Sequence, residues 1–528
     1  MSFRLRLQTA PLLLFLEFSW ALFMASGYES LATAQQIQNP YKIITIATSQ
    51  ASTWSRSKHW KPGDEQVPLE ISGMCTLPNG RLAVAIRRGE VWLIDGAYDT
   101  SGEKLKLHRF ASALHEPLGL VRYRDGLCTA QRTEVTLLRD TDHDDVADDY
   151  ETINQSWGVS GNYHEYAYGP VVDDHDNLWL TLNIGMGFQG GQKGKLLPSK
   201  WGGPQAPWRG WGVRISRAGK FEPVAAGMRS PSGLGTNLDD DVFFTDQQGN
   251  WIPVCSLHHL RPGVFYGHPD ALASMQLPGG QLKGIVDIPN GIPYPEAVAQ
   301  VPALVPPAVW FPYKKMGQSA TDVVCDTTRG KFGPFQGQLF VGEFTLASIS
   351  RVFLENVDGE YQGACFPFHE GLDSAVIRLT FGEDGSLFAG LSNRGWSSVG
   401  RASYGLQRLV WDKKTPFEIL EMRARSDGFE LVFTKPVDDR TATDVNSYTM
   451  ESYTYQYHQV YGSDELFKKP VSIISADLSA DGRRVHLKTQ PLRELYVHEL
   501  RATGVRSTDD EPLIHADAYY TLNRIPDE

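Results

Sequence analysis

The stretch GEDGSLFAGL (residues 382–391) is a tight turn of Gly, Glu and Asp that leads directly into a strand of alternating apolar and small residues. The same format, a turn containing Asn, Asp or Gly followed by a short strand, occurs five more times. The other copies are LPNGRLAVAI (77–86), YRDGLCTAQ (123–131), DDHDNLWLTL (173–182), NLDDDVFFTD (237–246) and FQGQLFVGE (335–343). Turn residues that bound short β-rich runs are typical of antiparallel sheets.

The spacing of these six strands predicts the architecture. Their first residues lie 45, 51, 64, 97 and 48 positions apart. Repeats of about 40 to 50 residues with a turn–strand signature are typical of the blades of a β-propeller. An irregular β-sandwich is the alternative, and six copies of one format favour the propeller. We therefore predict an all-β fold with a six-bladed β-propeller over residues 69–412.

Three further segments complete the predicted organisation. Residues 252–316 are rich in Pro, which removes donors from a sheet ladder, so we expect them to form a loop excursion rather than a blade. The strand at 404–411 is expected to close the last blade. Short alternating strands then predict a small β-sandwich of the immunoglobulin or fibronectin III type over residues 416–528. Its aromatic run YTYQYHQVY (453–461) is interpreted as the packed face of a strand rather than as a ligand platform.

The first 34 residues predict an export signal. Arg4 and Arg6 precede a long apolar stretch, and Ala32-Thr33-Ala34 offers a small-residue cleavage site. A retained anchor helix is the alternative, and no later apolar run is long enough to cross a bilayer. We therefore expect a periplasmic or secreted protein that has no transmembrane span after signal removal and in which residues 35–68 form an N-terminal extension.

Charge and cysteine content restrict the class of partner. The formal net charge of −12 would repel nucleic acids and anionic membranes, so a small neutral or cationic substrate fits better. Five Cys residues are too few and too scattered for a disulfide framework, and their odd number leaves at least one free or bonded to another chain. The sequence contains no C-x-x-C-H, so no c-type haem is expected.

The acidic stretch DTDHDDVADDYE (140–151) has the spacing of a calcium loop of the EF-hand type. The predicted ligands are Asp140, Asp142, Asp144, Val146, Asp148 and Glu151, with the backbone carbonyl of Val146 at position 7 and a bidentate Glu at position 12. Asp145 stands where the loop usually has Gly, and Asp tolerates the positive φ that this turn requires. A solvated acidic run is the alternative.

Five motifs occur in order along the predicted propeller: EPLGL (116–120), NYHEYAYGP (162–170), AGMRSPSGL (226–234), FFTDQQG (243–249) and GVFYGHP (263–269). With this series, residues 70–410 resemble the six-bladed propellers of the glucose/sorbosone dehydrogenase type. The chain is most similar to the family of membrane-bound dehydrogenases in which that propeller often precedes other modules, here without a haem c module. Some members of the wider family oxidise sugars with pyrroloquinoline quinone (PQQ) and calcium.

The resemblance implies roles for two residues. His164 is the general base that removes a proton from a sugar hydroxyl, and Arg229 contacts the quinone oxygens and stabilises negative charge there. The further residues that it implies for the cofactor site are Asp246, Gln247, Asn250, Arg378 and Arg394. The family has Gly after the motif His, whereas Glu165 and Tyr166 follow here. A His hydrogen-bonded within a strand turn, and arginines paired locally, are the alternatives.

Two classes of function follow. The first is a PQQ-dependent dehydrogenase that oxidises a carbohydrate or alcohol and passes its electrons to a separate carrier. The second is a non-redox propeller that binds or processes carbohydrate and is stabilised by calcium. For either class we expect His164, Arg229 and the 246–250 loop to open onto one end of the central channel.

Overall fold

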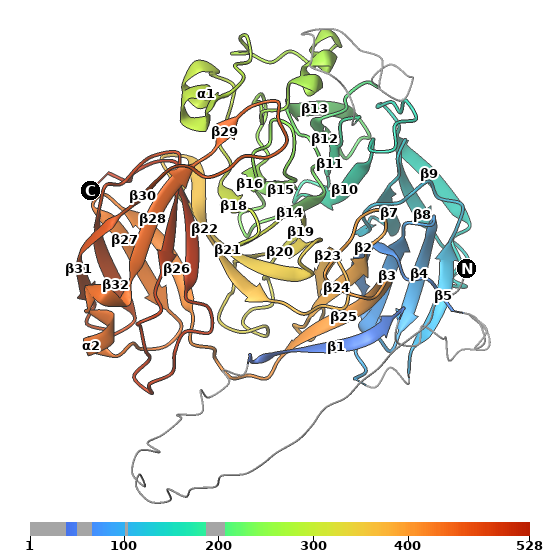
Figure 1. Cartoon of the computed structure of the whole chain (residues 1–528). Helices are drawn as coiled ribbons and strands as arrows, with labels where there is room; N and C mark the ends of the chain where they lie inside the picture. The colour runs from blue at the N-terminus through green and yellow to red at the C-terminus, as the bar shows by residue number, and fades with distance from the viewer. Residues whose placement is uncertain (1–38, 50–65, 101–103, 186–205, 528) are drawn as a thin grey trace, which may run out of the picture. The chain divides into compact units, whose positions relative to one another are not determined.

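The computed structural model describes residues 39–49, 66–100, 104–185 and 206–527. The predicted export signal at 1–34 lies outside these residues. Within them, six antiparallel sheets follow one another along the chain as propeller blades (Figure 1). The innermost strand of each blade packs beside that of the next, and the last packs beside the first, so the ring is closed. The predicted all-β propeller is confirmed.

The strands of the first three blades are as follows. Blade one contains β2 (Ile71–Leu77), β3 (Arg81–Ile86), β4 (Glu90–Asp95) and β5 (Lys106–Ala111), with the short helix η1 (Pro78–Gly80) in its first turn. Blade two contains β6 (Val121–Tyr123), β7 (Gly126–Ala130), β8 (Val135–Arg139) and β9 (Asp149–Asn154). Blade three contains β10 (Ala167–Val172), β11 (Leu178–Leu182), β12 (Trp211–Ile215) and β13 (Phe221–Ala226).

The other three blades complete the ring. Blade four contains β14 (Gly233–Thr236), β15 (Val242–Asp246), β16 (Cys255–His259) and β18 (Val309–Phe311). Blade five contains β19 (Ala320–Cys325), β20 (Leu339–Glu343), β21 (Ser348–Val357) and β22 (Glu360–His369). Blade six contains β23 (Val376–Phe381), β24 (Leu387–Ser392), β25 (Tyr404–Trp411) and β1 (Tyr41–Thr48). In every blade the strand copy found in the sequence is the second strand, which is flanked by a neighbour on each side.

The outermost strand of blade six comes from the N-terminal part of the chain. Strand β1 pairs antiparallel with β25, from Tyr41 opposite Trp411 to Thr48 opposite Gly405. The Tyr41 hydroxyl also donates a hydrogen bond to the carbonyl of Phe332 (2.8 Å). The propeller therefore includes a strand from the segment that the sequence assigned to an N-terminal extension, and β25 is the third rather than the last strand of its blade.

The Pro-rich segment 252–316 is only in part an excursion. Its two ends form β16 and β18, the outer strands of blade four, so the prediction that the whole segment lies outside the blades was wrong. The prolines at 253, 307 and 312 lie just outside these strands, where they remove no ladder donor. The excursion itself contains the helix η2 (Pro269–Gln276), β17 (Ile292–Pro293) and α1 (Tyr294–Gln300).

The C-terminal residues form the predicted β-sandwich. One sheet contains β26 (Ile419–Arg425), β27 (Gly428–Phe433), β32 (Arg484–Gln490) and β31 (Ser472–Leu478), and the other β28 (Thr449–Thr454), β30 (Leu466–Pro470), β33 (Tyr496–Arg501) and β34 (Asp517–Leu522). Connecting segments contain α2 (Asp439–Ala442), η3 (Val445–Ser447) and β29 (Gln456–Tyr457).

The sandwich and the propeller share one sheet. Strand β34 pairs with β22 of blade five at Gly363 opposite Thr521 and Cys365 opposite Tyr519, which gives an eight-stranded sheet. Phe353 and Phe366 of blade five are buried in the same core as Phe429 and Leu487 of the sandwich. Residues 39–528 accordingly form a single compact unit.

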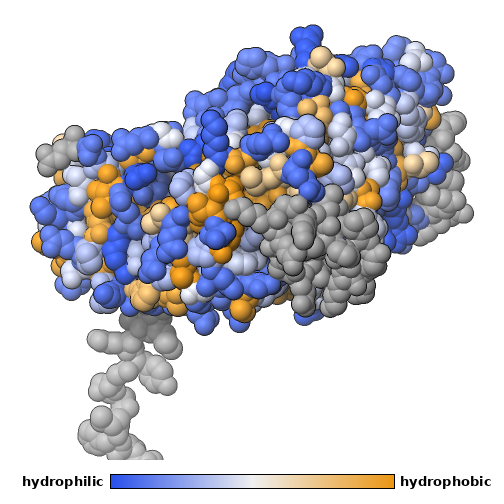
Figure 2. All heavy atoms as spheres, turned by 90° about the horizontal axis from the view of Figure 1, so that it is seen from above, coloured by the Kyte–Doolittle hydropathy of each residue, from blue (hydrophilic) through white to orange (hydrophobic). Residues whose placement is uncertain are grey.

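In Figure 2 the surface of the described residues is mainly hydrophilic, and their cysteines form no disulfide bonds. Seen from above, hydrophilic side chains cover most of the visible face, and apolar residues lie in patches between them (Figure 2). Among the described residues, no helix has the length and apolarity needed to span a membrane. All five cysteines are free thiols, and four of them are buried.

Candidate functional site

A cavity of about 570 Å³ lies at one end of the central channel. Its lining contains residues that lie in, or just before, the innermost strand of every blade: Ser72, Leu118, Tyr168, Ser232, Thr321 and Arg378. Such a position, where several rigid strands end together, is a common place for a ligand site because loops can add side chains around a fixed frame.

Arg378 forms the floor of this cavity. Its guanidinium donates hydrogen bonds to the carbonyl oxygens of Ser72 (2.8 Å), Ser232 (3.0 Å) and Leu118 (3.2 Å), which belong to three other blades. The residue is only 5% exposed, and it also lines a second cavity of about 290 Å³ on the other side of the channel. Arg378 therefore closes the channel and is held by protein groups rather than free to bind a cofactor.

Arg229 also lines the cavity, but, unlike that of Arg378, its guanidinium forms no hydrogen bond with the described residues. It is 7% exposed, and its guanidinium lies against the backbone of Gly249 and 5.3 Å from the ring centroid of Tyr461. Its Nε is buried, and no hydrogen bond or ion pair of this side chain occurs in the described part of the chain. Burial lowers the pKa of Arg229, but a guanidinium remains charged in proteins. A buried cation without a partner is costly unless an anion binds beside it.

Asp246 is the acidic residue that shapes this corner. It is fully buried, and its carboxylate accepts hydrogen bonds from the backbone N–H groups of Arg229 (2.8 Å), Ser230 (2.7 Å) and Gln247 (2.9 Å). Burial raises the pKa of Asp246 to about 6, although these hydrogen bonds and Arg229 oppose the rise. Asp246, which the resemblance implied for the cofactor site, thus positions the backbone around Arg229 and is not itself part of the cavity lining.

His164 lines the same cavity as Arg229. Its backbone N–H donates to Asn162 Oδ1 (3.0 Å), which fixes the turn, while its buried Nδ1 has no hydrogen-bond partner among the described residues. Burial, together with the positive charges of Arg229, Arg132 and Arg87, lowers the pKa of His164 below 6.5. The imidazole is therefore neutral at neutral pH and can accept a proton.

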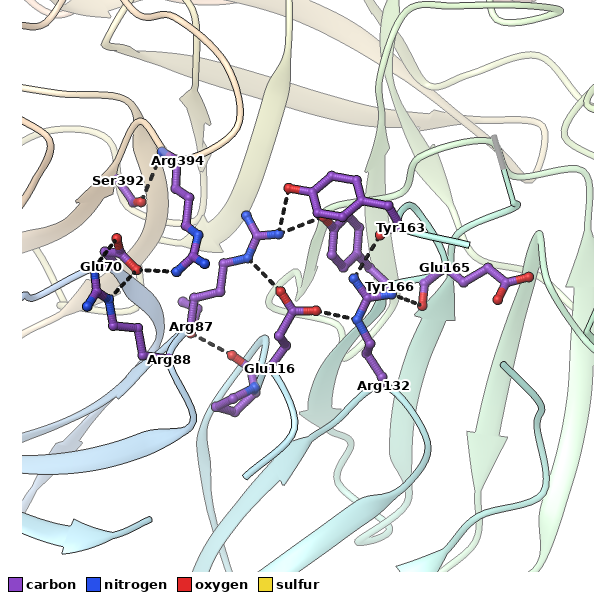
Figure 3. Close-up of polar contacts among 12 residues, drawn as sticks. Glu70, Arg87, Arg88, Glu116, Arg132, Tyr163, Glu165, Tyr166, Ser392 and Arg394 are labelled. Carbon is purple, nitrogen blue, oxygen red and sulfur yellow. Dashed lines mark hydrogen bonds and ion pairs between the residues drawn. The ribbon is translucent and has the colours of Figure 1, made fainter. Parts of the chain in front are cut away.

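A second group of charges, which the sequence did not reveal, is drawn in Figure 3, and two of its arginines, Arg132 and Arg87, help to lower the pKa of His164. Glu116 pairs with Arg87 (3.0 Å) and with Arg132. Arg87 also donates hydrogen bonds to the hydroxyls of Tyr163 (3.0 Å) and Tyr166 (2.7 Å). Burial alone would raise the pKa of Glu116, but its hydrogen bonds and charge interactions with Arg132 and Arg87 lower it. The carboxylate is thus ionised, and it holds both arginines under the tyrosines.

Glu165, next to His164, is not in the cavity. Its carboxylate points away from the Arg87–Glu116 group (Figure 3) and accepts hydrogen bonds from Ser160 N (2.6 Å) and Ser160 Oγ (2.8 Å). Of the two residues that follow His164 where the family has Gly, Tyr166 lines the cavity and Glu165 does not. The bulk that follows His164 in the sequence is therefore mostly directed elsewhere.

The remaining predicted cofactor contacts divide between the cavity and its surroundings. Gln247 lines the cavity, and its side-chain amide donates to Ser232 Oγ (3.2 Å). Arg394 also lines the cavity and forms an ion pair with Glu70 (2.8 Å). This local ion pair is the alternative to cofactor binding that the sequence allowed for the arginines. Asn250 does not line the cavity, because its amide donates to the carbonyl of Gln459 (2.6 Å).

The acidic loop at 140–151 lies elsewhere, between β8 and β9. Carboxylate oxygens of Asp140, Asp142 and Asp144 all lie within 4.8 Å of one another. The negative charge of Asp144, followed by burial and the charges of Asp148 and Asp140, raises the pKa of Asp142. Asp145 adopts the expected positive φ, 70°, at the position that usually has Gly.

Not all predicted ligands join this carboxylate group. Glu151 lies on β9 and pairs instead with Arg139 (2.5 Å) of the neighbouring strand β8. Asp148 accepts hydrogen bonds from the backbone N–H (3.1 Å) and hydroxyl (2.7 Å) of Thr141. The Val146 N–H donates to Asp144 (2.9 Å), which tightens the turn. The structure thus brings together three of the five predicted carboxylate ligands.

We compared the chain with protein families, with curated proteins and with solved structures. Residues 74–272 match a family described as a domain of unknown function, DUF7133. No curated protein matches the chain. The solved structures that are similar include an oxidoreductase of Thermus thermophilus described as a glucose dehydrogenase, with 16% identity, a TM-score of 0.47, and coverage of 70% of this chain and 100% of that chain.

Two others are described as binding PQQ or as a PQQ domain. The PQQ-bound aldose sugar dehydrogenase from Streptomyces coelicolor is 12% identical, with a TM-score of 0.45 and coverage of 70% of this chain and 98% of that chain. The holo form of the pyranose dehydrogenase PQQ domain from Coprinopsis cinerea is 10% identical, with a TM-score of 0.46 and coverage of 71% of this chain and 96% of that chain.

The position of Arg229 depends on Gly249, and this can be tested. A Cβ at residue 249 would lie 1.9 Å from Arg229 Nε, so Gly249→Ala must displace the guanidinium, which is the flexible end of a long side chain. We expect an unfolding midpoint close to that of the wild type, but an affinity of the cavity for a polycarboxylate anion that is lower by about tenfold.

Gly317→Ala is the matched control, because its Cβ would meet no atom closer than 3.5 Å. Isothermal titration of both variants with PQQ, a tricarboxylate, provides the comparison. Equal affinities in the two variants would show that the placement of Arg229 does not determine anion binding.

Proposed function

We propose that this protein is a PQQ-dependent dehydrogenase that oxidises a hydroxyl group of a carbohydrate or similar alcohol. The observation that supports the proposal is that one cavity contains both a cation that can bind an anionic cofactor and a base that can accept a proton. In the described residues, the Arg229 guanidinium is a buried cation that forms no hydrogen bond or ion pair, and His164 is a neutral imidazole whose Nδ1 has no hydrogen-bond partner. One attracts an anion, and the other accepts a proton.

The residues of the cavity fit an anionic cofactor. Arg87, Arg229, Arg378 and Arg394 line it, whereas Glu70 is the only acidic residue among the described residues of the lining. This local excess of positive charge occurs in a chain with a net charge of −12, so it focuses anions onto one place. Arg229 would bind the cofactor directly, while Arg87 and Arg394 would contribute to the field. When bound, the quinone would supply the two-electron oxidant.

His164 and Arg229 have separate roles in this proposal. His164 would take the proton from the substrate hydroxyl, because its lowered pKa keeps it unprotonated at neutral pH. Arg229 would stabilise the negative charge that develops on the oxygen it faces. The Arg87–Glu116–Arg132 group would position Tyr163 and Tyr166 beside His164 and keep its imidazole neutral by adding positive charge nearby.

Export and a separate electron carrier belong to the same proposal. The N-terminal signal pattern supports a periplasmic or secreted enzyme. The sequence lacks the C-x-x-C-H motif of an attached c-type haem, so electrons would leave through another protein or a small acceptor.

One observation favours the non-redox alternative, a propeller that binds or processes carbohydrate. Of the three arginines implied for the cofactor, Arg378 is bonded to carbonyl groups and Arg394 to Glu70, which leaves Arg229 as the one without a partner in the described residues. A tricarboxylate held by a single free arginine would bind less tightly than one held by three.

We further propose that the loop at 140–151 binds calcium with a structural effect. Three carboxylates converge there, and oxygen ligands of this kind suit calcium. No residue of this loop lines the cavity, so the ion would stabilise the β8–β9 connection under either class of function.

The dehydrogenase proposal predicts different effects for its two central residues. His164→Ala should lower turnover by about 10²- to 10⁴-fold with little change in PQQ affinity, because a general base acts on the substrate proton. Arg229→Ala should weaken PQQ binding by about 10- to 100-fold, because a charge-assisted contact is lost. Dye-coupled sugar oxidation and PQQ titration measure the two effects, and Arg217→Ala, an exposed arginine of blade three, is the control.

The pH profile of kcat/KM gives a third readout of the same prediction. Because burial and nearby positive charges lower the pKa of His164, kcat/KM should fall on acidification only at a lower pH than for an ordinary imidazole, as the ring becomes protonated. A wild-type protein that takes up no PQQ in the presence of calcium, yet binds sugars, would favour the non-redox alternative.

The calcium proposal predicts a gain in stability on binding. Calcium should raise the thermal unfolding midpoint of the wild type in a concentration-dependent way, because the ion binds the folded state. Asp142→Asn combined with Asp144→Asn should abolish this shift, whereas Asp174→Asn, an exposed Asp of another turn, should preserve it. Differential scanning calorimetry with calcium and with chelator provides the test, and an equal shift in all three proteins would argue against the site.

A further inference from the structure

The C-terminal domain contributes a segment to the propeller. Residues 455–463, between β28 and β30, form what we call the bridging loop. Its strand β29 leaves the sandwich and pairs with β17 of the blade-four excursion, at Ile292 opposite Tyr457 and Pro293 opposite Gln456 (Figure 1). The aromatic run that the sequence suggested to be a packed strand face therefore continues into a loop on the propeller.

A second set of hydrogen bonds fixes the bridging loop next to Arg229. These bonds run from Gly462 N to Gly249 O (3.1 Å), from Trp251 N to His458 O (2.9 Å), from Asn250 Nδ2 to Gln459 O (2.6 Å) and from Ser463 N to Pro253 O (2.9 Å). Most of them involve backbone groups on both sides, so the loop is held in place independently of its outward side chains.

The side chain that this arrangement places in the cavity is Tyr461. Its ring lies over the guanidinium of Arg229, yet the residue is 61% exposed, so much of the ring faces the cavity. Its hydroxyl forms no hydrogen bond with the described residues. An exposed aromatic ring fixed at the wall of a cavity offers a flat apolar surface to a ligand.

Tyr461 is one of several exposed aromatic residues in the lining. The others are Tyr163, Tyr313 and Trp396, and the four are between 42 and 72% exposed. The four residues come from separate segments of the chain. Their exposure in one cavity therefore does not result from a single exposed strand face. A sugar ring has an apolar C–H face and polar hydroxyl edges, which matches a lining of aromatic rings with Arg229 and His164 beneath them.

We propose that the C-terminal domain takes part in ligand recognition, and that Tyr461 is a specificity-determining residue whose ring stacks on the apolar face of a sugar ring bound in the cavity. The ligand class in this inference rests on the proposed function. The contribution of the C-terminal domain rests on the bridging loop alone. Tyr461 would bind the substrate beside Arg229, so that changes in this loop select among sugars without altering the propeller.

The test compares three variants of the full-length protein. Tyr461→Ala removes the ring, Tyr461→Phe keeps it without the hydroxyl, and Val460→Ala changes an exposed neighbour that does not line the cavity. Isothermal titration with a panel of aldoses and disaccharides is carried out on protein without quinone. We expect about tenfold weaker binding of the preferred sugar for Tyr461→Ala, and near wild-type binding for Tyr461→Phe and Val460→Ala.

Other outcomes would overturn this inference. These are equal sugar affinities in the wild type and Tyr461→Ala, a loss that Tyr461→Phe does not restore, or no sugar binding by the wild type. A uniform loss for all sugars, without a change in their order of preference, would likewise exclude a role in specificity. PQQ uptake is measured separately on the wild type, so failure of the dehydrogenase proposal and failure of the Tyr461 proposal give different results.

Discussion

The site depends on a single buried guanidinium at the centre of the ring. Arg378 hydrogen-bonds to carbonyl oxygens of three other blades and closes the central channel. A buried charge is tolerated there because neutral carbonyl groups satisfy most of its donors, with Asp322 at 3.8 Å. The channel consequently ends in a cavity with a floor, and the loops above that floor determine what can bind.

Above this floor, almost every charge has a partner in the protein. Glu116 holds Arg87 and Arg132, and Glu70 holds Arg394. Among the described residues that line the cavity, Arg229 is the arginine whose guanidinium forms no hydrogen bond or ion pair, and the carboxylate of its neighbour Asp246 accepts hydrogen bonds from three backbone N–H groups. The cavity therefore combines a cation that needs an anion with a histidine that is kept neutral, which are the requirements for oxidising an alcohol with an anionic cofactor. Tyr461 extends this site into the C-terminal domain.

The sequence predicted those features that local patterns encode. The second strand of each blade was found because it follows a marked turn and, like Leu178–Leu182, is buried along its length. Strand β1 was missed because YKIITIAT carries no turn signature and its partner β25 lies at the opposite end of the propeller sequence. The motifs located His164 and Arg229, whereas the ion pairs of Glu116 and the contact of Tyr461 join residues far apart in the chain. Glu151 pairs with Arg139 because the loop ends in a strand rather than in the helix of an EF-hand, which the spacing alone does not reveal.

The central claim is that Arg229 is the anchor for an anionic ligand in the cavity beside His164. A crystal structure of the protein grown with PQQ and calcium tests it most directly. The account predicts a ligand oxygen within hydrogen-bonding distance of the Arg229 guanidinium, with His164 facing the same bound molecule. A ligand bound outside the cavity, or an Arg229 side chain paired with a protein carboxylate in the complex, would contradict it.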